Sequence, residues 1–321
     1  MVRPYRAPAW LPGGHLQTIH AYLRARCMPV PMYVRTRWET PDGDFVDIDR
    51  LGAQRGAPLV VLFHGLEGSS TSHYARALAM PFLEAGWRLA IPHFRGCSGE
   101  PNRLPRAYHS GDSEEIGWIL SRFAAETQGS ALAALGISLG GNALLKWLGE
   151  QGVHAVETIR CAVAVSAPVD LTVAGPALGR GFNRVYARMF LSSLKRKMRE
   201  KADRFPGLID ESRLNSARTL REFDDALTAP LHGFRDAEDY WQRASSRPWL
   251  GYIRVPSLLI NARNDPFLPA PGLPSPVEVS RCVELDFPDQ GGHVGFASGR
   301  FPGNFDWFGD RIMGFIRQHL A

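Results

Sequence analysis

Residues 131–143 read ALAALGISLGGNA, and this stretch decides the fold. Its first part, Ala131–Ile137, is a continuous apolar run that predicts a strand buried on both faces. The residues that follow, Leu139–Gln151, predict a helix, and the G-x-S-x-G pattern of Gly136–Gly140 lies between the two. Glycines on both sides of Ser138 permit a sharp turn without a Cβ clash. The stretch therefore indicates an α/β fold in which a serine hydroxyl is presented at the end of a strand.

Strands and helices alternate in both directions from this stretch. Apolar runs bounded by turn residues predict further strands over Tyr33–Trp38, Phe45–Leu51, Leu59–Phe63, Trp87–Ile91, Cys161–Val165, Ser257–Asn261 and Val283–Asp286. Periodic patterns predict further helices over Ser72–Ala85, Asp112–Ala125 and Asn304–Leu320. This alternation is typical of a mostly parallel central sheet with helices on both faces. Because ligands bind beyond the carboxyl ends of such strands, functional residues should directly follow them.

Two segments depart from the alternation. Residues 1–32 are rich in proline and predict an irregular arm that lies over the body. Residues from about 171 to 252 are helical in composition and have no clear strand. We expect this second segment to be an insertion that forms a helical cap over the site. Residues 1–321 would then make a single domain that carries an arm and a cap.

The candidate nucleophile Ser138 requires two partners. A serine hydroxyl becomes reactive when a base takes its proton and a carboxylate orients that base, and in folds of this kind the chain order is Ser, Asp or Glu, His. His293 follows the last predicted strand in a glycine-rich loop, which makes it the candidate base. Asp265 follows the strand Ser257–Asn261 and is the candidate acid. Asp170, which follows the strand before that one, is the alternative.

The oxyanion that forms when a serine attacks an acyl group requires N–H donors that are already in place. One candidate is the amide of Leu139, directly after the nucleophile. The second is the amide of Leu66, in the loop His64–Gly68 that follows the strand Leu59–Phe63. A serine, a histidine and an aspartate perform this chemistry without a metal, so no cofactor is implied.

The composition excludes several other classes of function. The net charge of +5, with 21% charged residues, lacks the dense basic patch of a nucleic-acid binder. The four cysteines are scattered and form no C-x-x-C pair, so neither a zinc site nor a disulfide framework is expected. The first residues lack the apolar centre of a signal peptide, and no apolar stretch is long enough to cross a bilayer. We therefore expect a cytoplasmic protein.

Residues 179–204 carry nine lysines and arginines against two acidic residues. Phe190, Leu194 and Met198 recur every four positions and would share one helix face. This pattern is typical of a lid helix whose apolar face covers the pocket and whose charges lie in solvent. The alternative is a weak contact of a basic amphipathic cap with a membrane surface or an anionic lipid.

Two further clusters have structural interpretations. Arg95, in the segment Phe94–Gly99, predicts a turn in which the guanidinium pairs with a carboxylate. Asp112 lies at the start of a predicted helix and is expected to cap it. Neither cluster is expected to take part in the chemistry at the serine.

Several motifs are shared with a known family, and they are Trp10–Thr18, His64–Gly68, Phe94–Glu100, Tyr108–Asp112, Gly136–Gly141 and Asn264–Pro266. On these residues, nearly the whole chain resembles the YheT-like branch of the α/β-hydrolases, which is related to the abhydrolase-domain lipases and the yeast medium-chain ethyl ester synthases. The resemblance implies the α/β-hydrolase fold and the triad roles for Ser138, Asp265 and His293. It also implies carboxylesterase or acyl-transfer activity on short to medium acyl chains. The Pro-rich segment Pro269–Pro276 departs from the family pattern and is expected to alter the pocket rim.

Three classes of function remain open at this point. The first is a serine carboxylesterase that hydrolyses a small ester or a lipid through an acyl-enzyme. The second is an acyltransferase or a lipase that uses the same triad. The third is a non-catalytic binding protein on a hydrolase scaffold, which the presence of all three candidate residues disfavours.

Overall fold

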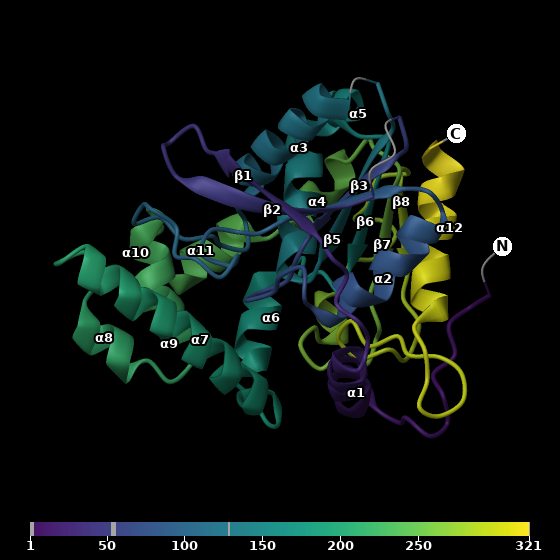
Figure 1. Ribbon diagram of the computed structural model, residues 1–321. Helices are drawn as coiled ribbons and strands as arrows, with labels where there is room; N and C mark the ends of the chain where they lie inside the picture. The colour runs from purple at the N-terminus through teal and green to yellow at the C-terminus, as the bar shows by residue number, and fades with distance from the viewer. Residues whose placement is uncertain (1–2, 53–55, 128, 321) are drawn as a thin grey trace.

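The centre of the computed structural model, which describes residues 3–52, 56–127 and 129–320, is an eight-stranded sheet (Figure 1). Its strands are β1 (Val34–Glu39), β2 (Phe45–Leu51), β3 (Leu59–Phe63), β4 (Arg88–Pro92), β5 (Leu132–Ile137), β6 (Cys161–Val165), β7 (Ser257–Ile260) and β8 (Val283–Asp286). The strand order is β1-β2-β4-β3-β5-β6-β7-β8. β2 runs antiparallel to β1 and β4, and the neighbours from β4 to β8 are parallel.

Helices cover both faces of the sheet (Figure 1). The described helices are α1 (Gly14–Arg26), α2 (His73–Glu84), α3 (Ser113–Thr127), α4 (Leu139–Gln151), α5 (Ala155–Thr158), α6 (Leu171–Leu178), α7 (Asn183–Arg204), α8 (Glu211–Ser216), α9 (Leu220–Phe223), α10 (Ala229–Leu231), α11 (Ala237–Ala244) and α12 (Asp306–Leu320). Alternate side chains of β3 enter different cores, because successive strand residues point to opposite faces. Val60 and Leu62 pack in the core that includes α2 and α12, while Val61 and Phe63 pack in the core that includes α3 and α4.

The expected α/β architecture is confirmed. Each strand and helix expected from the sequence is present, with bounds that differ from the expected ones by at most two residues. These elements are recognisable because local patterns define them: fully buried strands read as continuous apolar runs, and helices repeat every three or four residues.

The expectation of an irregular N-terminal arm is wrong for Gly14–Arg26, which form helix α1. Gln17, Ala21 and Ala25 face inward and are buried. The helix has a narrow buried stripe and a first turn without an acidic residue, so its own sequence gives a weak helix signal. Its burial comes from α2 and from loops near the carboxyl end of the chain. Residues 1–2, at the start of the arm, lie outside the described part of the chain.

Helices α6 to α11 lie within residues 171–252, the segment expected from composition to be helical and to have no strand, and we refer to these helices as the cap. In Figure 1 they extend to one side of the sheet, and α7 crosses below it towards α1. A cavity of about 1130 Å³ lies between the cap and the loops that follow β3, β4 and β5. In the described ranges, no helix combines the length and the apolar character needed to span a bilayer.

Candidate active site

Ser138 lies on a strained turn between β5 and α4. Its backbone has φ 51° and ψ −118°, a conformation that residues other than glycine rarely adopt. The two flanking glycines are required sterically: a Cβ at Gly140 would lie 2.5 Å from the carbonyl oxygen of Phe63, and one at Gly136 would lie 2.5 Å from Cα of Gly141. The turn places the serine hydroxyl before the first turn of α4, where the helix dipole favours negative charge.

The structure brings the predicted base and acid to this hydroxyl. His293 Nε2 lies 3.0 Å from Ser138 Oγ, and His293 Nδ1 lies 2.8 Å from Asp265 Oδ2. The Asp265 side chain is fully buried, and its Oδ1 accepts a hydrogen bond from the amide of Phe267 at 2.8 Å. The Phe267 ring lies against the imidazole, with the ring centroids 4.3 Å apart. The serine, histidine and aspartate therefore form a continuous hydrogen-bonded row.

Asp170, the alternative acid, has a different place. It is the N-cap of α6, where its Oδ1 accepts a hydrogen bond from the amide of Thr172 at 3.1 Å. Its Oδ2 lies 3.2 Å from a guanidinium nitrogen of Arg247. These contacts give Asp170 a structural role: it is the N-cap residue of α6, and it binds Arg247 in the segment that follows α11.

The two predicted oxyanion donors lie beside the serine. A Cβ at Gly65, the residue before Leu66, would lie 3.2 Å from Cβ of Ser138, so the loop after β3 passes close to the nucleophile. Within the described chain, neither the amide of Leu66 nor that of Leu139 has a hydrogen-bond partner. Both residues line the cavity. The arrangement can therefore offer two N–H groups to a charge that develops on a bound acyl group.

His64 fixes the start of this loop. Its Nδ1 lies 2.8 Å from the carbonyl oxygen of Gly65, and its Nε2 accepts a hydrogen bond from the amide of Phe94 at 3.0 Å. Burial lowers the pKa of His64 to about 3, so the ring is neutral at pH 7 and can both donate and accept. The amide of Gly65 donates to the hydroxyl of Tyr74 at 2.9 Å. The residues that follow β3 are thus held to both α2 and the loop after β4.

The same loop is joined to the cap through Glu67, whose φ is 54°. The hydroxyl of Tyr108 accepts from the Glu67 amide at 2.9 Å and donates to its Oε1 at 2.8 Å. From α7, Lys197 donates to Oε1 at 2.8 Å, and Ser193 donates to Oε2. Sequence reasoning missed this cluster, because its members are up to 130 residues apart.

Helix α7 matches the expected lid helix in one respect and departs from it in another. Phe190, Leu194 and Met198 line the cavity, as expected for an apolar face that covers the pocket. The expectation that its charges lie in solvent is wrong for Lys197, which binds Glu67, and for Lys201, which is 4% exposed. Both ammonium groups therefore have acceptors within the protein: Lys197 binds Glu67, and Lys201 binds Asn102 and the Leu104 carbonyl.

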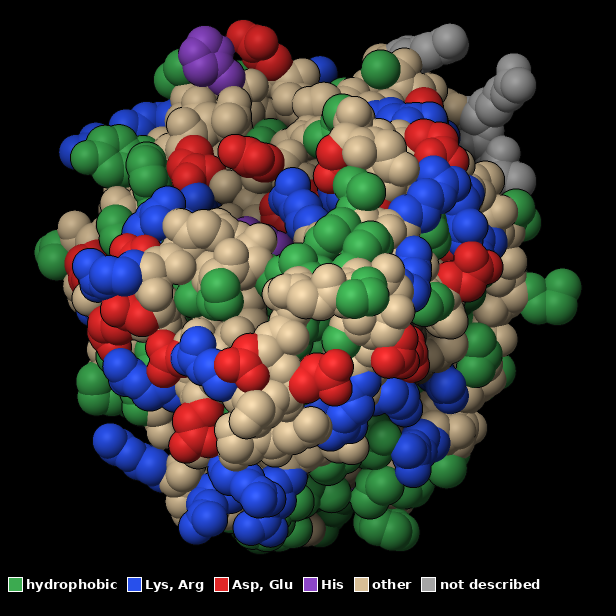
Figure 2. All heavy atoms as spheres, turned by 90° about the vertical axis from the view of Figure 1, so that its left-hand side faces the viewer, with side chains coloured by type: hydrophobic (Ala, Val, Ile, Leu, Met, Phe, Trp, Pro, Cys, Tyr) green, Lys and Arg blue, Asp and Glu red, His purple; other side chains and the backbone are tan. Residues whose placement is uncertain are grey.

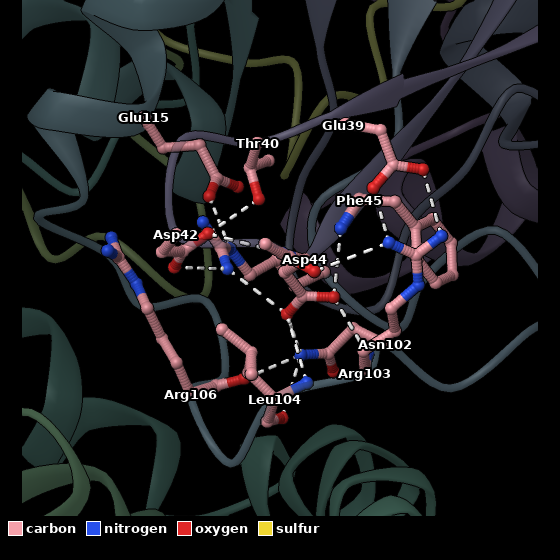
Figure 3. Close-up of polar contacts among 12 residues, drawn as sticks. Glu39, Thr40, Asp42, Asp44, Phe45, Asn102, Arg103, Leu104, Arg106 and Glu115 are labelled. Atoms are coloured by element: carbon pink, nitrogen blue, oxygen red, sulfur yellow. Dashed lines mark hydrogen bonds and ion pairs between the residues drawn. The ribbon is translucent and has the colours of Figure 1, made fainter.

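Lys201 binds a polar cluster that Figure 3 shows in close-up, centred on Asp44 in the turn between β1 and β2. Asp44 is fully buried and accepts from the Asn102 amide group at 2.6 Å and the Arg103 backbone amide at 2.7 Å. Lys201 donates to Oδ1 of Asn102 and to the Leu104 carbonyl, both at 2.7 Å. The hairpin turn therefore holds the 102–106 loop, and that loop holds the C-terminal half of α7.

The sequence predicted structural roles for Arg95 and Asp112, and the structure agrees with the first but not with the second. Arg95 is paired with carboxylates as expected: it lies 2.6 Å from Glu115, 2.8 Å from Asp42 and 3.1 Å from Asp44. Asp112 was expected to cap α3, but its Oδ1 accepts from Arg106 at 2.6 Å and its Oδ2 has no partner in the described chain.

The cavity combines apolar and polar walls around Ser138. Its apolar part includes a small cluster of Ala174, Phe267 and Leu268 with Leu178, Tyr186 and Phe190 packed against it. Its polar part includes side chains from the loops after β3 and β4 and from the C-terminal half of α7. Within residues 3–52, 56–127 and 129–320, no group of three His, Cys, Asp or Glu side chains is arranged to hold a metal ion.

The chain is similar to known proteins over most of its length. The family described as "alpha/beta hydrolase fold" matches residues 58–299. YheT of Escherichia coli (strain K12), which is provisionally named an esterase, is 40% identical over 311 residues, and the match covers 95% of this chain and 91% of that one. Phospholipase ABHD3 of Mus musculus is 27% identical over 286 residues, covering 85% and 69%. The solved structure of the alpha/beta hydrolase GrgF from Penicillium sp. sh18 shares the fold, with a TM-score of 0.60, 16% sequence identity and coverage of 91% and 100%.

Proposed function

The chain belongs to the alpha/beta hydrolase fold family, and from this premise we propose that it is a serine carboxylesterase that hydrolyses short- to medium-chain acyl esters. One observation carries the proposal: the 3.0 Å contact between Ser138 and His293, continued by the 2.8 Å contact between His293 and Asp265. A nucleophile, a base and an orienting carboxylate in this order are the parts that acyl transfer requires.

In the acylation half-reaction, Ser138 Oγ attacks the ester carbonyl carbon while His293 Nε2 takes the hydroxyl proton. Asp265 holds the imidazole through Nδ1–H and stabilises its cationic form. The carbonyl oxygen becomes an oxyanion, which accepts hydrogen bonds from the amides of Leu66 and Leu139. Collapse breaks the ester C–O bond, and the leaving alkoxide takes the proton from His293 Nε2, which leaves an acyl-enzyme and a free alcohol.

In the deacylation half-reaction, water occupies the position that the alcohol has left. His293 takes one proton from the water as its oxygen attacks the acyl carbon, and the same two amides donate hydrogen bonds to the second oxyanion. The Ser138 Oγ–acyl bond breaks, and the proton on His293 returns to the serine. The products are a carboxylic acid and an alcohol, and the free enzyme is restored.

The acyl chain is best accommodated by the apolar part of the cavity. Phe267 contacts the imidazole of His293, and Tyr186 and Phe190 of α7 pack on Phe267. This cluster begins beside the reacting atoms and extends under the cap, so a chain bound there has its carbonyl carbon near Ser138. Burial of each methylene contributes about 0.8 kcal/mol, which favours substrates with several of them.

Lipid esters are included in the proposed substrates because the mouth of the cavity fits a lipid surface. Five of the residues that line the cavity are large, apolar and 43–57% exposed, and they are Tyr22, Leu23, Phe182, Val185 and Met189. Two of them lie in α1, Phe182 directly precedes α7, and the other two lie in the first half of α7. Residues 1–38 and 171–199 contain no aspartate or glutamate. An apolar rim on uniformly cationic segments is complementary to an anionic lipid surface. The mouse relative is named a phospholipase.

The basic character does not extend over the whole cap. Figure 2 shows the side of the molecule on which most of the cap lies in Figure 1, and there Lys and Arg are interspersed with Asp and Glu. We therefore place the lipid contact at Arg180, Arg184 and Arg188, which are exposed and have no ion-pair partner within the described chain. In the second half of α7, Lys197, Lys201 and Arg204 instead bind acceptors within the protein.

The proposal extends to the organisation and location of the chain. We propose one catalytic domain over residues 1–321, with an arm of about 1–32 and a cap insertion of about 171–252. The cysteines Cys27, Cys97, Cys161 and Cys282 are free thiols, which favours a reducing compartment such as the cytoplasm.

Hydrolysis of a series of p-nitrophenyl esters with increasing acyl length tests the proposed function. Ser138→Ala should lower kcat/KM by about 1,000-fold or more, because the nucleophile is lost. Ser69→Ala is the matched control, since Ser69 also lines the cavity but its hydroxyl contacts only Thr71. Equal rates for the wild type and Ser138→Ala would refute the proposal. Repeating the series with added ethanol measures the ethyl ester formed, which separates acyl transfer from hydrolysis.

A further inference from the structure

Helix α1 contacts both of the loops that carry the proposed acid and base. Gln17, on this helix, is fully buried. Its Nε2 donates to the carbonyl of Leu11 at 3.0 Å and to Oε1 of Gln290 at 2.8 Å. Its Oε1 accepts from Nδ2 of Asn264 at 3.0 Å and from the amide of Gly291 at 2.9 Å. All four hydrogen-bonding positions of this amide are therefore used to join the arm, the acid loop and the base loop.

Thr18, the next residue, holds the backbone of the base itself. Its hydroxyl accepts a hydrogen bond from the amide of His293 at 2.9 Å and donates to the carbonyl of Gly14 at 2.7 Å. The two loops are also joined to each other, because the amide of Gly292 donates to Oδ1 of Asn264 at 3.0 Å. The imidazole is thus attached to a backbone that α1 fixes from outside.

The approach of α1 to these loops is close enough to leave little freedom. A Cβ at Gly14 would lie 2.0 Å from the carbonyl oxygen of Asn264. Gly292 has φ 60°, and a Cβ there would lie 2.6 Å from the carbonyl oxygen of Gly14. A glycine-rich loop has many accessible backbone conformations, so its own sequence does not fix one of them. The contacts with α1 therefore fix the conformation of the loop that carries His293.

We propose that Gln17 and Thr18 are positioning residues: they set the place of His293 relative to Ser138 and Asp265, although neither side chain touches the reacting atoms. The inference rests on the proposed function, because it assigns these residues a role in proton transfer. Transfer between Ser138 Oγ and His293 Nε2 depends on the 3.0 Å separation, and a displacement of about 1 Å in such a contact can lower a rate by about 100-fold.

Thr18→Val is the main test, because valine keeps the size of threonine and removes the hydroxyl. The amide of His293 then loses its acceptor, and a methyl carbon requires about 3.5 Å or more where the oxygen lies at 2.9 Å. We expect kcat to fall by about 10- to 100-fold, with KM changed by less than about threefold. The rate at which a fluorophosphonate labels Ser138 should fall by the same factor. Thr18→Ser keeps the hydroxyl and should retain kcat within about threefold.

Two further variants separate positioning from general stability. Thr18→Ala removes the hydroxyl without adding a methyl group, so it keeps the test available if Thr18→Val does not fold. Tyr5→Phe is the matched control, because it removes a buried 2.8 Å hydrogen bond from the arm to the carbonyl of Ala297, beyond the base loop. Tyr5→Phe should lower the melting temperature without changing kcat.

The outcomes distinguish this inference from the function on which it rests. If the wild type hydrolyses esters and the folded Thr18→Val and Thr18→Ala variants match it in kcat, the positioning role is wrong and the proposed function stands. A loss that Tyr5→Phe shares, or that Thr18→Ser does not recover, also overturns the positioning role, because it reflects the docking of the arm as a whole. A wild type that neither hydrolyses esters nor reacts with the fluorophosphonate overturns the proposed function and this inference together.

Discussion

The Nζ atom of Lys197 on α7 lies 2.8 Å from Oε1 of Glu67, the residue that directly follows the proposed oxyanion donor Leu66. Burial acts to lower the pKa of Lys197, but the neighbouring Cys97 and Glu67 raise it above its usual value, so the ammonium stays charged. This ion pair, together with the hydrogen bond from Ser193 to Glu67, connects the cap to the loop that carries the proposed oxyanion donor.

Lys197→Met should weaken this connection and lower kcat by about 10-fold, because the Leu66 amide is then less firmly placed. Unfolding in urea should show a loss of about 1.5–3 kcal/mol, the range for a hydrogen bond to a charged group. Lys195→Met is the control: Lys195 donates to the carbonyls of Asn215 and Ala217 within the cap. If both variants reduce kcat equally, the connection through Glu67 is not the cause.

Gly140→Ala should destabilise the fold by about 2 kcal/mol or more, because the added Cβ would lie 2.5 Å from the Phe63 carbonyl oxygen and 2.6 Å from that of His64. Gly251→Ala should change the unfolding free energy by less than about 0.5 kcal/mol, since its Cβ would meet the carbonyl oxygen of Glu278 at an ordinary 3.6 Å. Equal unfolding free energies for the two variants would contradict the tight contact between β3 and α4.

Glu115 should make stability depend on pH. Burial and the neighbouring Asp112 raise its pKa from 4.5 to about 7, against the opposing effect of Arg95. The folded state therefore binds more protons than the unfolded state between about pH 4.5 and 7. The contribution to stability is full below pH 4.5 and is lost as the pH rises to about 7.

Glu115→Gln should remove that dependence and raise the melting temperature at pH 8, on the order of a few degrees. Arg95 keeps two other carboxylates, Asp42 and Asp44, in the variant. Glu114→Gln, on the exposed side of the same helix turn, is the control. A wild type whose melting temperature does not decline relative to Glu115→Gln between pH 5 and pH 8 would show that the carboxyl is not protonated in the folded state.

Reversing two charges at the cavity mouth should weaken lipid binding. The double variant Arg184→Glu with Arg188→Glu should bind vesicles that contain phosphatidylglycerol at least about 10-fold more weakly, because each cation near an anionic surface contributes about 1 kcal/mol. The control is the double variant Arg160→Glu with Arg254→Glu. It changes the net charge by the same amount, but beside the amino ends of β6 and β7. Sedimentation with vesicles measures both. Equal weakening in the two double variants would point to net charge and not to the mouth.

The sheet and the turn at Ser138 could be predicted because local sequence specifies them. Strand β5 reads as an unbroken apolar run, and glycine is required at Gly140, where a Cβ would lie 2.5 Å from the carbonyl oxygen of Phe63 and 2.6 Å from that of His64. The placement of Asp170 was harder, because it depends on α6 beginning directly after it. Two aspartates that each follow a strand look alike until the helices around them are known.

Contacts between distant segments could not be predicted. Gln17 meets Gly291 across 274 positions, and Lys197 meets Glu67 across 130, so no local pattern relates them. A lysine-rich helix also has the same sequence whether its ammonium groups lie in solvent or bind buried acceptors. The helix at Gly14–Arg26 was missed for the same reason, since it is buried by α2 and by residues that follow β7 and β8.

The most direct test of the account is the mass of the protein after incubation with a fluorophosphonate. The account predicts one adduct for each chain, located on Ser138 by peptide mapping, and none on folded Ser138→Ala. A folded wild type that remains unmodified, or that carries its adduct on another residue, would contradict the claim that Ser138 is the nucleophile of an esterase.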